Sequence, residues 1–263
     1  MLTACFDTAR TDIAHDLVVV AGFAGFAKAW SEFDFTWNDR LKRDGLSVFH
    51  SGDFAQFRKE FKYGWRDNEP RRIALLRDLM DIIRGHGLRR FGCAVPIGVQ
   101  QGISPQVRSR FDAYVHAALA TVDQFNHYAR SINVDRNVRC VFEKGENETI
   151  LRERFREEGY ADPDFTWKSP FTDRKGFTHD GFLGLQAAGW IAYEYYLDTS
   201  RVFDVKTSVD AIENGRWAYR EFETLPGFIQ CAVSPKVSEM VVKVRDATQH
   251  LAKLRPHRKR GVV

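Results

Sequence analysis

Residues 2–26 read LTACFDTARTDIAHDLVVVAGFAGF, and this stretch decides the predicted fold. Residues 2–7 form a short apolar run that ends in an acid, and residues 15–26 contain three consecutive valines. Short runs rich in apolar and β-branched residues are typical of buried strands. Residues 8–14, which lie between the two runs, have the length of a hairpin connection. The chain is therefore predicted to open with two strands of a buried sheet.

Amphipathic helices are predicted to follow these strands. Within residues 28–42, one face of a helix collects the side chains of Trp30, Phe33, Trp37 and Leu41, which recur at steps of three and four. Gly45 suits the end of this helix. Further helices are predicted at residues 70–85, 106–130, 147–158 and 183–197, and further strands at residues 89–99, 138–143 and 165–168. Long helices between the later strands indicate an α/β fold, with a mixed central sheet flanked by helices.

The chain length of 263 residues allows one or two domains. We predict one domain over residues 1–200 and a C-terminal helical extension over residues 201–263 that packs on it. The helices of this extension are expected near residues 209–225 and 237–254. The extension ends in a basic tail formed by Lys253, Arg255, Arg258, Lys259 and Arg260. A solvated, frayed terminus is the common explanation of such a tail, although basic tails also bind nucleic acid.

Composition and motifs exclude several classes of protein. Hydrophobic residues make up 44% of the chain and charged residues 28%, which is ordinary for a globular protein. The apolar residues 17–29 are too few and too interrupted to span a bilayer, and the N-terminus lacks a secretory signal, so we expect a cytoplasmic protein with no membrane partner. The four cysteines form no C-x-x-C pair, which indicates reduced and mostly buried thiols. The nucleotide-binding, G-x-S-x-G and H-E-x-x-H motifs are missing, which argues against kinases, dehydrogenases and common hydrolases.

Three segments carry a resemblance to a known family. They are CFDTARTD followed by DLVVVAGFAG in residues 5–25, residues 30–54 with VFHSGDF at their end, and LGLQAAGWIAYEYY at residues 183–196. Together they resemble the domain-of-unknown-function family 3800 over roughly residues 5–196. The resemblance implies a ribonuclease H-like fold and the activity of a metal-dependent nuclease that acts on or binds nucleic acid.

The resemblance also implies a set of acidic site residues. In the family the first strand ends in Asp-Glu, and the late helix carries Gln-x-x-Asp. Asp7 matches the strand aspartate and Gln186 matches the glutamine. Thr8 and Gly189 stand where the other two acids would be. Half of the acidic motif is therefore missing from this chain.

His50 and Glu143 complete the candidate catalytic set with Asp7 and Gln186. His50 matches a position that the family often uses, and Glu143 ends a predicted strand where such folds place another acid. Structural roles remain open for these residues. Asp7 can cap a nearby loop, Glu143 can belong to an exposed turn, and His50 can lie in a turn where Asp53 caps a helix that starts near residue 54.

Asp7 and Glu143 are the candidate metal ligands. Mg²⁺ and Mn²⁺ prefer oxygen ligands, and a two-metal nuclease needs several carboxylates around one phosphate. Gly189 supplies no oxygen to such a site. The next acid on the same helix, Glu194, lies five residues later and is rotated by about 140° on an ideal helix. We therefore expect Glu194 to face elsewhere.

Two further groups of side chains have alternative explanations. Lys168, Arg174 and Lys175 precede the late helix and are either phosphate contacts or, more commonly, surface charge. Aromatic residues on the helix itself stack on bases or, more commonly, fill the core. They are Trp190, Tyr193, Tyr195 and Tyr196.

Two functions remain open from the sequence. The first is a metal-dependent nuclease or phosphodiesterase that uses Mg²⁺ or Mn²⁺ at Asp7 and Glu143. The second is a catalytically degenerate member of the family that serves as a binding or assembly module, with nucleic acid or another protein as its partner. Thr8 and Gly189 motivate the second function.

Overall fold

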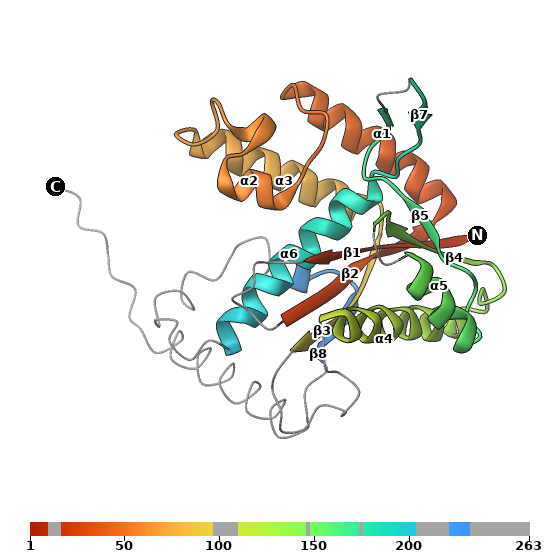
Figure 1. The fold of residues 1–263 in the computed structure, drawn as a ribbon. Helices are drawn as coiled ribbons and strands as arrows, with labels where there is room; N and C mark the ends of the chain where they lie inside the picture. The colour runs from red at the N-terminus through yellow and green to blue at the C-terminus, as the bar shows by residue number, and fades with distance from the viewer. Residues whose placement is uncertain (10–16, 97–109, 146–147, 174–175, 204–220, 232–263) are drawn as a thin grey trace.

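A computed structural model describes residues 1–9, 17–96, 110–145, 148–173, 176–203 and 221–231 (Figure 1). The elements in chain order are β1 (Leu2–Ala9), β2 (Leu17–Phe26), α1 (Ala27–Arg43), α2 (Ser51–Gln56), the 3-10 turn η1 (Lys59–Phe61), α3 (Glu69–Gly85), β3 (Arg89–Pro96), α4 (Arg110–Ser131), β4 (Val138–Glu143), α5 (Glu148–Glu157), β5 (Asp164–Thr166), β6 (Phe171–Thr172), β7 (Thr178–His179), α6 (Gly184–Phe203) and β8 (Gly227–Cys231).

Six strands form a mixed central sheet in the order β5-β4-β1-β2-β3-β8. β1, β2 and β3 are an antiparallel meander, in which Leu2 pairs with Phe26 and Leu17 pairs with Pro96. β4 runs parallel to β1, β5 runs parallel to β4, and β8 runs parallel to β3. The C-terminal ends of β1, β4 and β5 therefore meet at one edge of the sheet.

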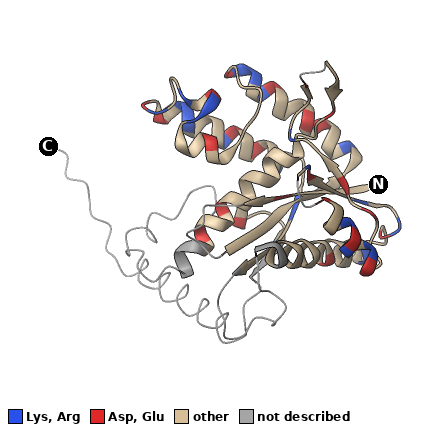
Figure 2. Ribbon diagram, viewed as in Figure 1, with Lys and Arg blue, Asp and Glu red and all other residues tan. Residues whose placement is uncertain are grey.

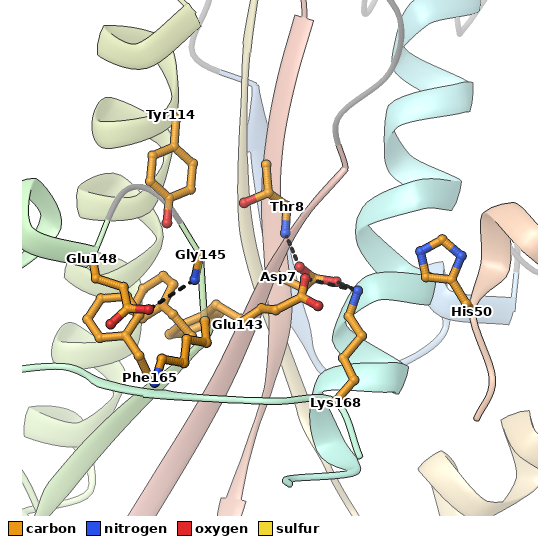
Figure 3. Close-up of a pocket in the computed structure, with 12 residues that line it drawn as sticks. Asp7, Thr8, His50, Tyr114, Glu143, Gly145, Glu148, Phe165 and Lys168 are labelled. Carbon is orange, nitrogen blue, oxygen red and sulfur yellow. Dashed lines mark hydrogen bonds and ion pairs between the residues drawn. The ribbon is translucent and has the colours of Figure 1, made fainter. Parts of the chain in front are cut away.

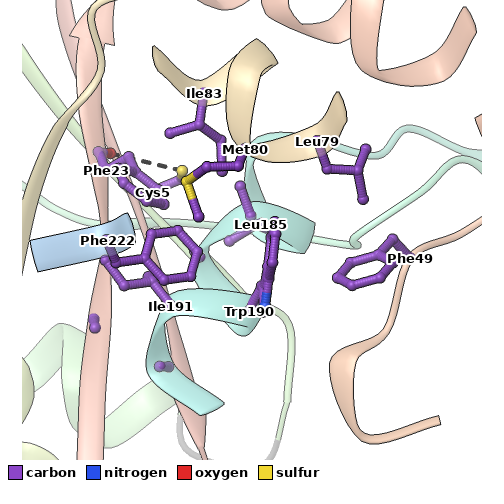
Figure 4. Packing of buried hydrophobic residues seen from close by; sticks show 14 of the residues in the cluster. Cys5, Phe23, Phe49, Leu79, Met80, Ile83, Leu185, Trp190, Ile191 and Phe222 are labelled. Atoms are coloured by element: carbon purple, nitrogen blue, oxygen red, sulfur yellow. Dashed lines mark hydrogen bonds between the residues drawn. The ribbon is translucent and has the colours of Figure 1, made fainter. Parts of the chain in front are cut away.

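Helices cover both faces of this sheet (Figure 1). Alternate residues of each strand point to opposite faces, so β1 sends Cys5 and Ala9 toward the layer of α1, α3 and α6, and sends Ala4 and Phe6 toward α4 and α5. Each layer buries its own apolar cluster. Figure 4 shows the first cluster, where Trp190 and Ile191 of α6 pack near Phe49 and Phe222. The predicted α/β fold with a mixed sheet and flanking helices is confirmed at this level.

The predicted aromatic face of α1 is confirmed. Trp30, Phe33 and Trp37 are buried, and the stacked rings of Phe33 and Trp37 have centroids 5.0 Å apart. Gly45, at φ 72°, follows the helix, and the backbone N–H groups of Gly45 and Leu46 donate to the carbonyls of Lys42 and Leu41. A residue with a side chain rarely adopts this φ, which explains glycine at the helix end.

The C-terminal part of the chain differs from the prediction where it is described. Residues 227–231 form β8, which extends the sheet beside β3, and the sequence analysis did not predict this strand. The expected helix at residues 237–254 and the basic tail lie outside the described residues. Cys5, Cys93 and Cys140 are free and buried, as expected. Within the described ranges, no helix combines the length and apolar character needed to cross a membrane.

Candidate functional site

A cavity of about 420 Å³ lies where β1, β4 and β5 end (Figure 3). Its lining joins acidic, basic and aromatic side chains from several elements: Phe6, Asp7, Thr8, His50, Tyr114, Phe142, Glu143, Lys144, Gly145, Glu148, Phe165 and Lys168. Three of the four predicted catalytic residues, Asp7, His50 and Glu143, are therefore brought together. The fourth, Gln186, lies behind the cavity.

Asp7 and Glu143 occupy equivalent positions at the ends of two parallel strands. Phe6 of β1 pairs in register with Phe142 of β4, and the two acids are the next residues along each strand. Both carboxyl groups turn to the same face of the sheet, because residues of parallel strands in register point the same way. Asp7 is buried, and the Glu143 side chain is 37% exposed. The Thr8 backbone N–H donates to Asp7 Oδ1 at 2.7 Å.

Lys168 brings its ammonium close to both carboxyl groups, which lie next to one another (Figure 3). Its Nζ lies 2.8 Å from Asp7 Oδ2 and 3.1 Å from Glu143 Oε2, and its side chain is 14% exposed. Lys168 follows β5 by two residues, so the third parallel strand brings it to the same edge. The common expectation that Lys168 is surface charge is wrong. Arg174 and Lys175 lie outside the described residues.

The side chain of Gln186 on α6 forms hydrogen bonds to three other segments of the chain. Its Oε1 accepts hydrogen bonds from Trp37 Nε1 at 3.0 Å and from the Phe49 backbone N–H at 2.8 Å. Its Nε2 donates to the carbonyl oxygen of Lys168 at 3.0 Å. The side chain is almost completely buried. Gln186 therefore holds the Lys168 backbone and the Phe49–His50 segment in place, and does not line the cavity.

Gly189 faces Asp7 from the next turn of α6. A Cβ on residue 189 would lie 2.5 Å from Asp7 Oδ2 and 3.4 Å from Lys168 Nζ. The position at which the resemblance implies an acid thus lies directly against the Asp7 carboxylate, and the Lys168 ammonium lies nearby. Ser51 Oγ donates to the Gly189 carbonyl at 3.4 Å, which ties α2 to this point of α6.

The three charges at the cavity perturb one another. Burial, followed by the charge of Asp7, raises the pKa of Glu143 to about 7, against the opposing effect of Lys168. Burial alone would lower the pKa of Lys168, but the carboxylates of Asp7 and Glu143 outweigh it and raise that pKa above its ordinary value. Lys168 is therefore charged at neutral pH, and Glu143 is poised to bind or release a proton.

His50 is the N-cap of α2. Its Nδ1 accepts from the Asp53 backbone N–H at 3.2 Å and lies 3.2 Å from Asp53 Oδ2. Burial, followed by the positive charge of Lys168, lowers the pKa of His50, so the ring is neutral at pH 7. The expectation that Asp53 caps a helix starting near residue 54 is wrong. Asp53 lies in the first turn of α2, and its Oδ2 pairs with Lys59 Nζ at 2.8 Å.

The remaining sequence expectations concern α6 and its aromatic residues. Trp190, Tyr195 and Tyr196 are buried and belong to the core, as the commoner explanation expected. Glu194 is also buried, and its Oε1 accepts from Trp190 Nε1 at 3.3 Å, away from the cavity lining. Tyr114, Phe165 and Glu148 also line the cavity, and they were not predicted from the sequence. Glu148 lies near the start of a predicted helix and Phe165 begins a predicted strand, whereas no local signal indicated Tyr114.

The donors around Asp7 do not fit a pair of divalent ions. A two-metal site needs several carboxylates that bridge and flank the ions, and residue 189 supplies none. Asp7 and Glu143 share the Lys168 ammonium, which fills the point where their oxygens converge. Glu148 Oε1 accepts instead from the Gly145 backbone N–H at 3.1 Å. Among the described residues, no three His, Cys, Asp or Glu side chains gather as metal ligands.

Comparisons with protein-family models, with curated proteins and with solved structures gave no match to this chain.

Proposed function

We propose that this chain is a ribonuclease H-like protein of family 3800 that binds nucleic acid and uses Lys168 as a fixed cation instead of a pair of metal ions. The strand arrangement supports the fold part of this proposal. β1, β2 and β3 form a meander, and β4 and β5 run parallel to β1. Helices on both faces of such a sheet are what a ribonuclease H-like fold requires.

One observation carries the functional part: the Lys168 ammonium lies 2.8 Å from Asp7 Oδ2 and 3.1 Å from Glu143 Oε2. An ammonium supplies positive charge and hydrogen-bond donors, but it has no coordination position for water. It does not produce the metal-bound hydroxide that attacks a phosphodiester. A bound ion would have to displace this charge from a largely buried pair. This arrangement supports the proposed loss of two-metal cleavage, and the proposed binding of nucleic acid rests on the resemblance.

A metal-dependent phosphodiesterase is the second candidate function. The observation that favours it is the convergence of Asp7 and Glu143 at equivalent strand positions beside an open cavity. In this candidate, Asp7 and Glu143 would hold Mg²⁺ or Mn²⁺, which would supply positive charge and activate water for attack on a phosphodiester. The two candidates therefore differ in one measurable property, which is the affinity of the Asp7 and Glu143 pair for a divalent ion.

The test combines a metal titration with a cleavage assay. Mn²⁺ binding is measured by electron paramagnetic resonance for the wild-type chain and for Lys168→Met, with Lys144→Met as the control. Lys144 lines the same cavity, so the control removes the same charge without touching the carboxylates. We expect Lys168→Met to bind Mn²⁺ at least about tenfold more tightly than the wild type, because a like charge has been removed from the site. The control is expected to stay within about threefold of the wild type.

Cleavage is then assayed with Mg²⁺ and Mn²⁺ on single-stranded and duplex DNA, RNA and hybrid substrates. The wild type is expected to cleave more than about a hundredfold more slowly than a relative with the complete acidic motif, because a lost direct ligand costs more than a lost outer partner. Gly189→Asp is tested alone and together with Lys168→Met, since the new Cβ meets Asp7. Gain of cleavage only in these variants supports the proposal. Fast cleavage by the wild type that Asp7→Ala abolishes would overturn it.

A further inference from the structure

The segment 57–72, which links α2 to the first turn of α3, carries a surplus of basic charge. It contains six Lys and Arg residues and three Asp and Glu residues. Figure 2 shows Lys and Arg gathered on this part of the helical layer. The sequence analysis did not single out this segment, and the cavity lining does not include it.

Part of this charge is neutralised within the fold. Lys59 Nζ pairs with Asp53, and Arg71 Nε donates to Asp44 Oδ1 at 2.8 Å. The carboxylate of Glu60 accepts hydrogen bonds from Ser47 and from the backbone N–H of Val48. Within the described residues, four cations of the segment have no carboxylate partner: Arg58, Lys62, Arg66 and Arg72. The buried Nε of Arg72 also lacks a hydrogen-bond acceptor.

Aromatic rings lie among these cations. The Tyr63 side chain is 76% exposed, and Lys62 Nζ lies 5.0 Å from the centre of its ring. The guanidinium groups of Arg66 and Arg72 lie 5.2 Å and 4.7 Å from the ring of Phe57. We name the exposed residues Arg58, Lys62, Tyr63 and Arg66 the basic-aromatic surface. Exposed rings stack on unpaired bases, and flanking cations contact phosphates.

We infer that the basic-aromatic surface docks single-stranded nucleic acid, an inference that rests on the proposed nucleic-acid-binding function. An anionic lipid surface fits less well, because the apolar residues of the segment that would insert, Phe61 and Trp65, are buried. A duplex hides its base faces from Tyr63.

A chain of contacts links this segment to the cavity. Lys59 follows Arg58 and pairs with Asp53, and Asp53 donates its backbone N–H to His50. His50 lines the cavity beside Lys168. These contacts connect the docking segment, through α2, to a residue of the candidate site.

The experiment measures fluorescence anisotropy of labelled 20-nucleotide dT and U oligomers with the full chain, between 50 and 200 mM KCl. The test variant replaces Arg58, Lys62 and Arg66 by Gln. The control variant replaces Arg130, Arg136 and Arg156 by Gln, which removes the same charge from exposed positions near the other helical layer. Thermal unfolding confirms that both variants fold. Tyr63→Ala tests stacking separately, and dT oligomers annealed to a complementary strand test the duplex.

We expect the test variant to bind at least about tenfold more weakly at 100 mM salt, and its slope of log affinity against log salt to fall by about 2, since each lost phosphate contact on a single strand removes about 0.7. The control is expected to stay within about threefold and to keep its slope. Tyr63→Ala should weaken binding at least about fivefold.

An equal loss of oligomer affinity in the test and control variants overturns the docking surface but not the proposed binding of nucleic acid. Absence of oligomer binding by the wild type at 50 mM KCl overturns both the surface and the proposed function. Binding to phosphatidylserine vesicles but not to oligomers assigns the surface to lipid and also overturns the inference. The two proposals can also fail separately. If only the test variant loses oligomer affinity, and the wild type cleaves nucleic acid in a reaction that needs Asp7, then the docking surface stands. In that case only the proposed absence of two-metal cleavage is overturned.

Discussion

Gly189 of α6 lies against the carboxylate of Asp7, so that a Cβ on residue 189 would come within 2.5 Å of Asp7 Oδ2. The contact joins a helix to the end of β1 across the candidate site. It leaves the Asp7 carboxylate room to accept from Lys168 Nζ on one oxygen and from the Thr8 backbone N–H on the other. The absence of a side chain at residue 189 and the presence of the Lys168 ammonium are therefore parts of one arrangement.

Gly189→Ala tests this arrangement. Alanine in a helix interior ordinarily stabilises by about 1 kcal/mol relative to glycine. At residue 189 we expect a loss of about 1–3 kcal/mol instead, because the Asp7 carboxylate must rotate away from its partners. Urea unfolding provides the measurement. Gly85→Ala is the control, because no atom lies within 4 Å of its Cβ at the end of α3. A Gly189→Ala protein as stable as the control variant would contradict the close contact.

Trp37→Ala tests the aromatic face of α1. Trp37 is fully buried, stacks on Phe33 and donates to Gln186. Truncation of a large core aromatic costs about 3–5 kcal/mol, and we expect a loss of this size in the free energy of unfolding. Phe35→Ala is the matched control on the same helix, since the Phe35 side chain is 76% exposed, and should change stability by under about 0.5 kcal/mol. A loss below about 1 kcal/mol for Trp37→Ala would mean that the indole is not part of the core.

Gln186→Met separates a positioning role from a catalytic one. The replacement has a similar volume but removes the acceptor for Trp37 and Phe49 and the donor to the Lys168 carbonyl. Each buried polar group left without a partner costs about 1–3 kcal/mol, so we expect a total loss of at least about 2 kcal/mol in chemical denaturation. A variant with wild-type stability but altered chemistry at the cavity would instead assign Gln186 a direct role.

Asp34→Asn tests a buried acid on α1 that lies outside the candidate site. Burial raises the pKa of Asp34 to about 7, and its Oδ1 has no hydrogen-bond partner. The folded chain therefore binds this proton more tightly than the unfolded chain. The contribution of the protonated Asp34 carboxyl to the free energy of unfolding is fully present below about pH 4 and is lost as the pH rises through about 7.

The neutral asparagine does not titrate. We therefore expect the stability of Asp34→Asn relative to the wild type to be greater at pH 8 than at pH 5. Urea unfolding of both proteins at the two pH values provides the measurement. An equal difference between the two proteins at pH 5 and pH 8 would show that Asp34 is ionised throughout.

Much of the fold was predictable from local pattern. The helix with Trp30, Phe33 and Trp37 on one face and the strand at residues 138–143 were expected from the sequence and are present as α1 and β4. Such elements depend on the spacing of apolar residues over one or two helical turns or over a few residues of a strand. Residues that are close in sequence are enough to specify this spacing. Asp7 and Glu143 were also identifiable from the resemblance and from their places at the ends of predicted strands, whereas their meeting at one edge depends on the parallel pairing of β1 with β4.

Only the tertiary structure decided which side chains share the site. The partners of Lys168 come from residues 7 and 143, and the partners of Gln186 come from residues 37, 49 and 168. These pairings depend on strand order and on the path of α6 across the sheet, which no local pattern encodes. The same holds for β8, a short strand that acquires its place by pairing with β3. The sequence by itself determined that Asp7 and Glu143 end apolar runs and that residue 189 has no side chain. The packing of Gly189 and Lys168 against Asp7 determined that the Lys168 ammonium is the partner of both acids, because a buried charge is costly unless it is paired.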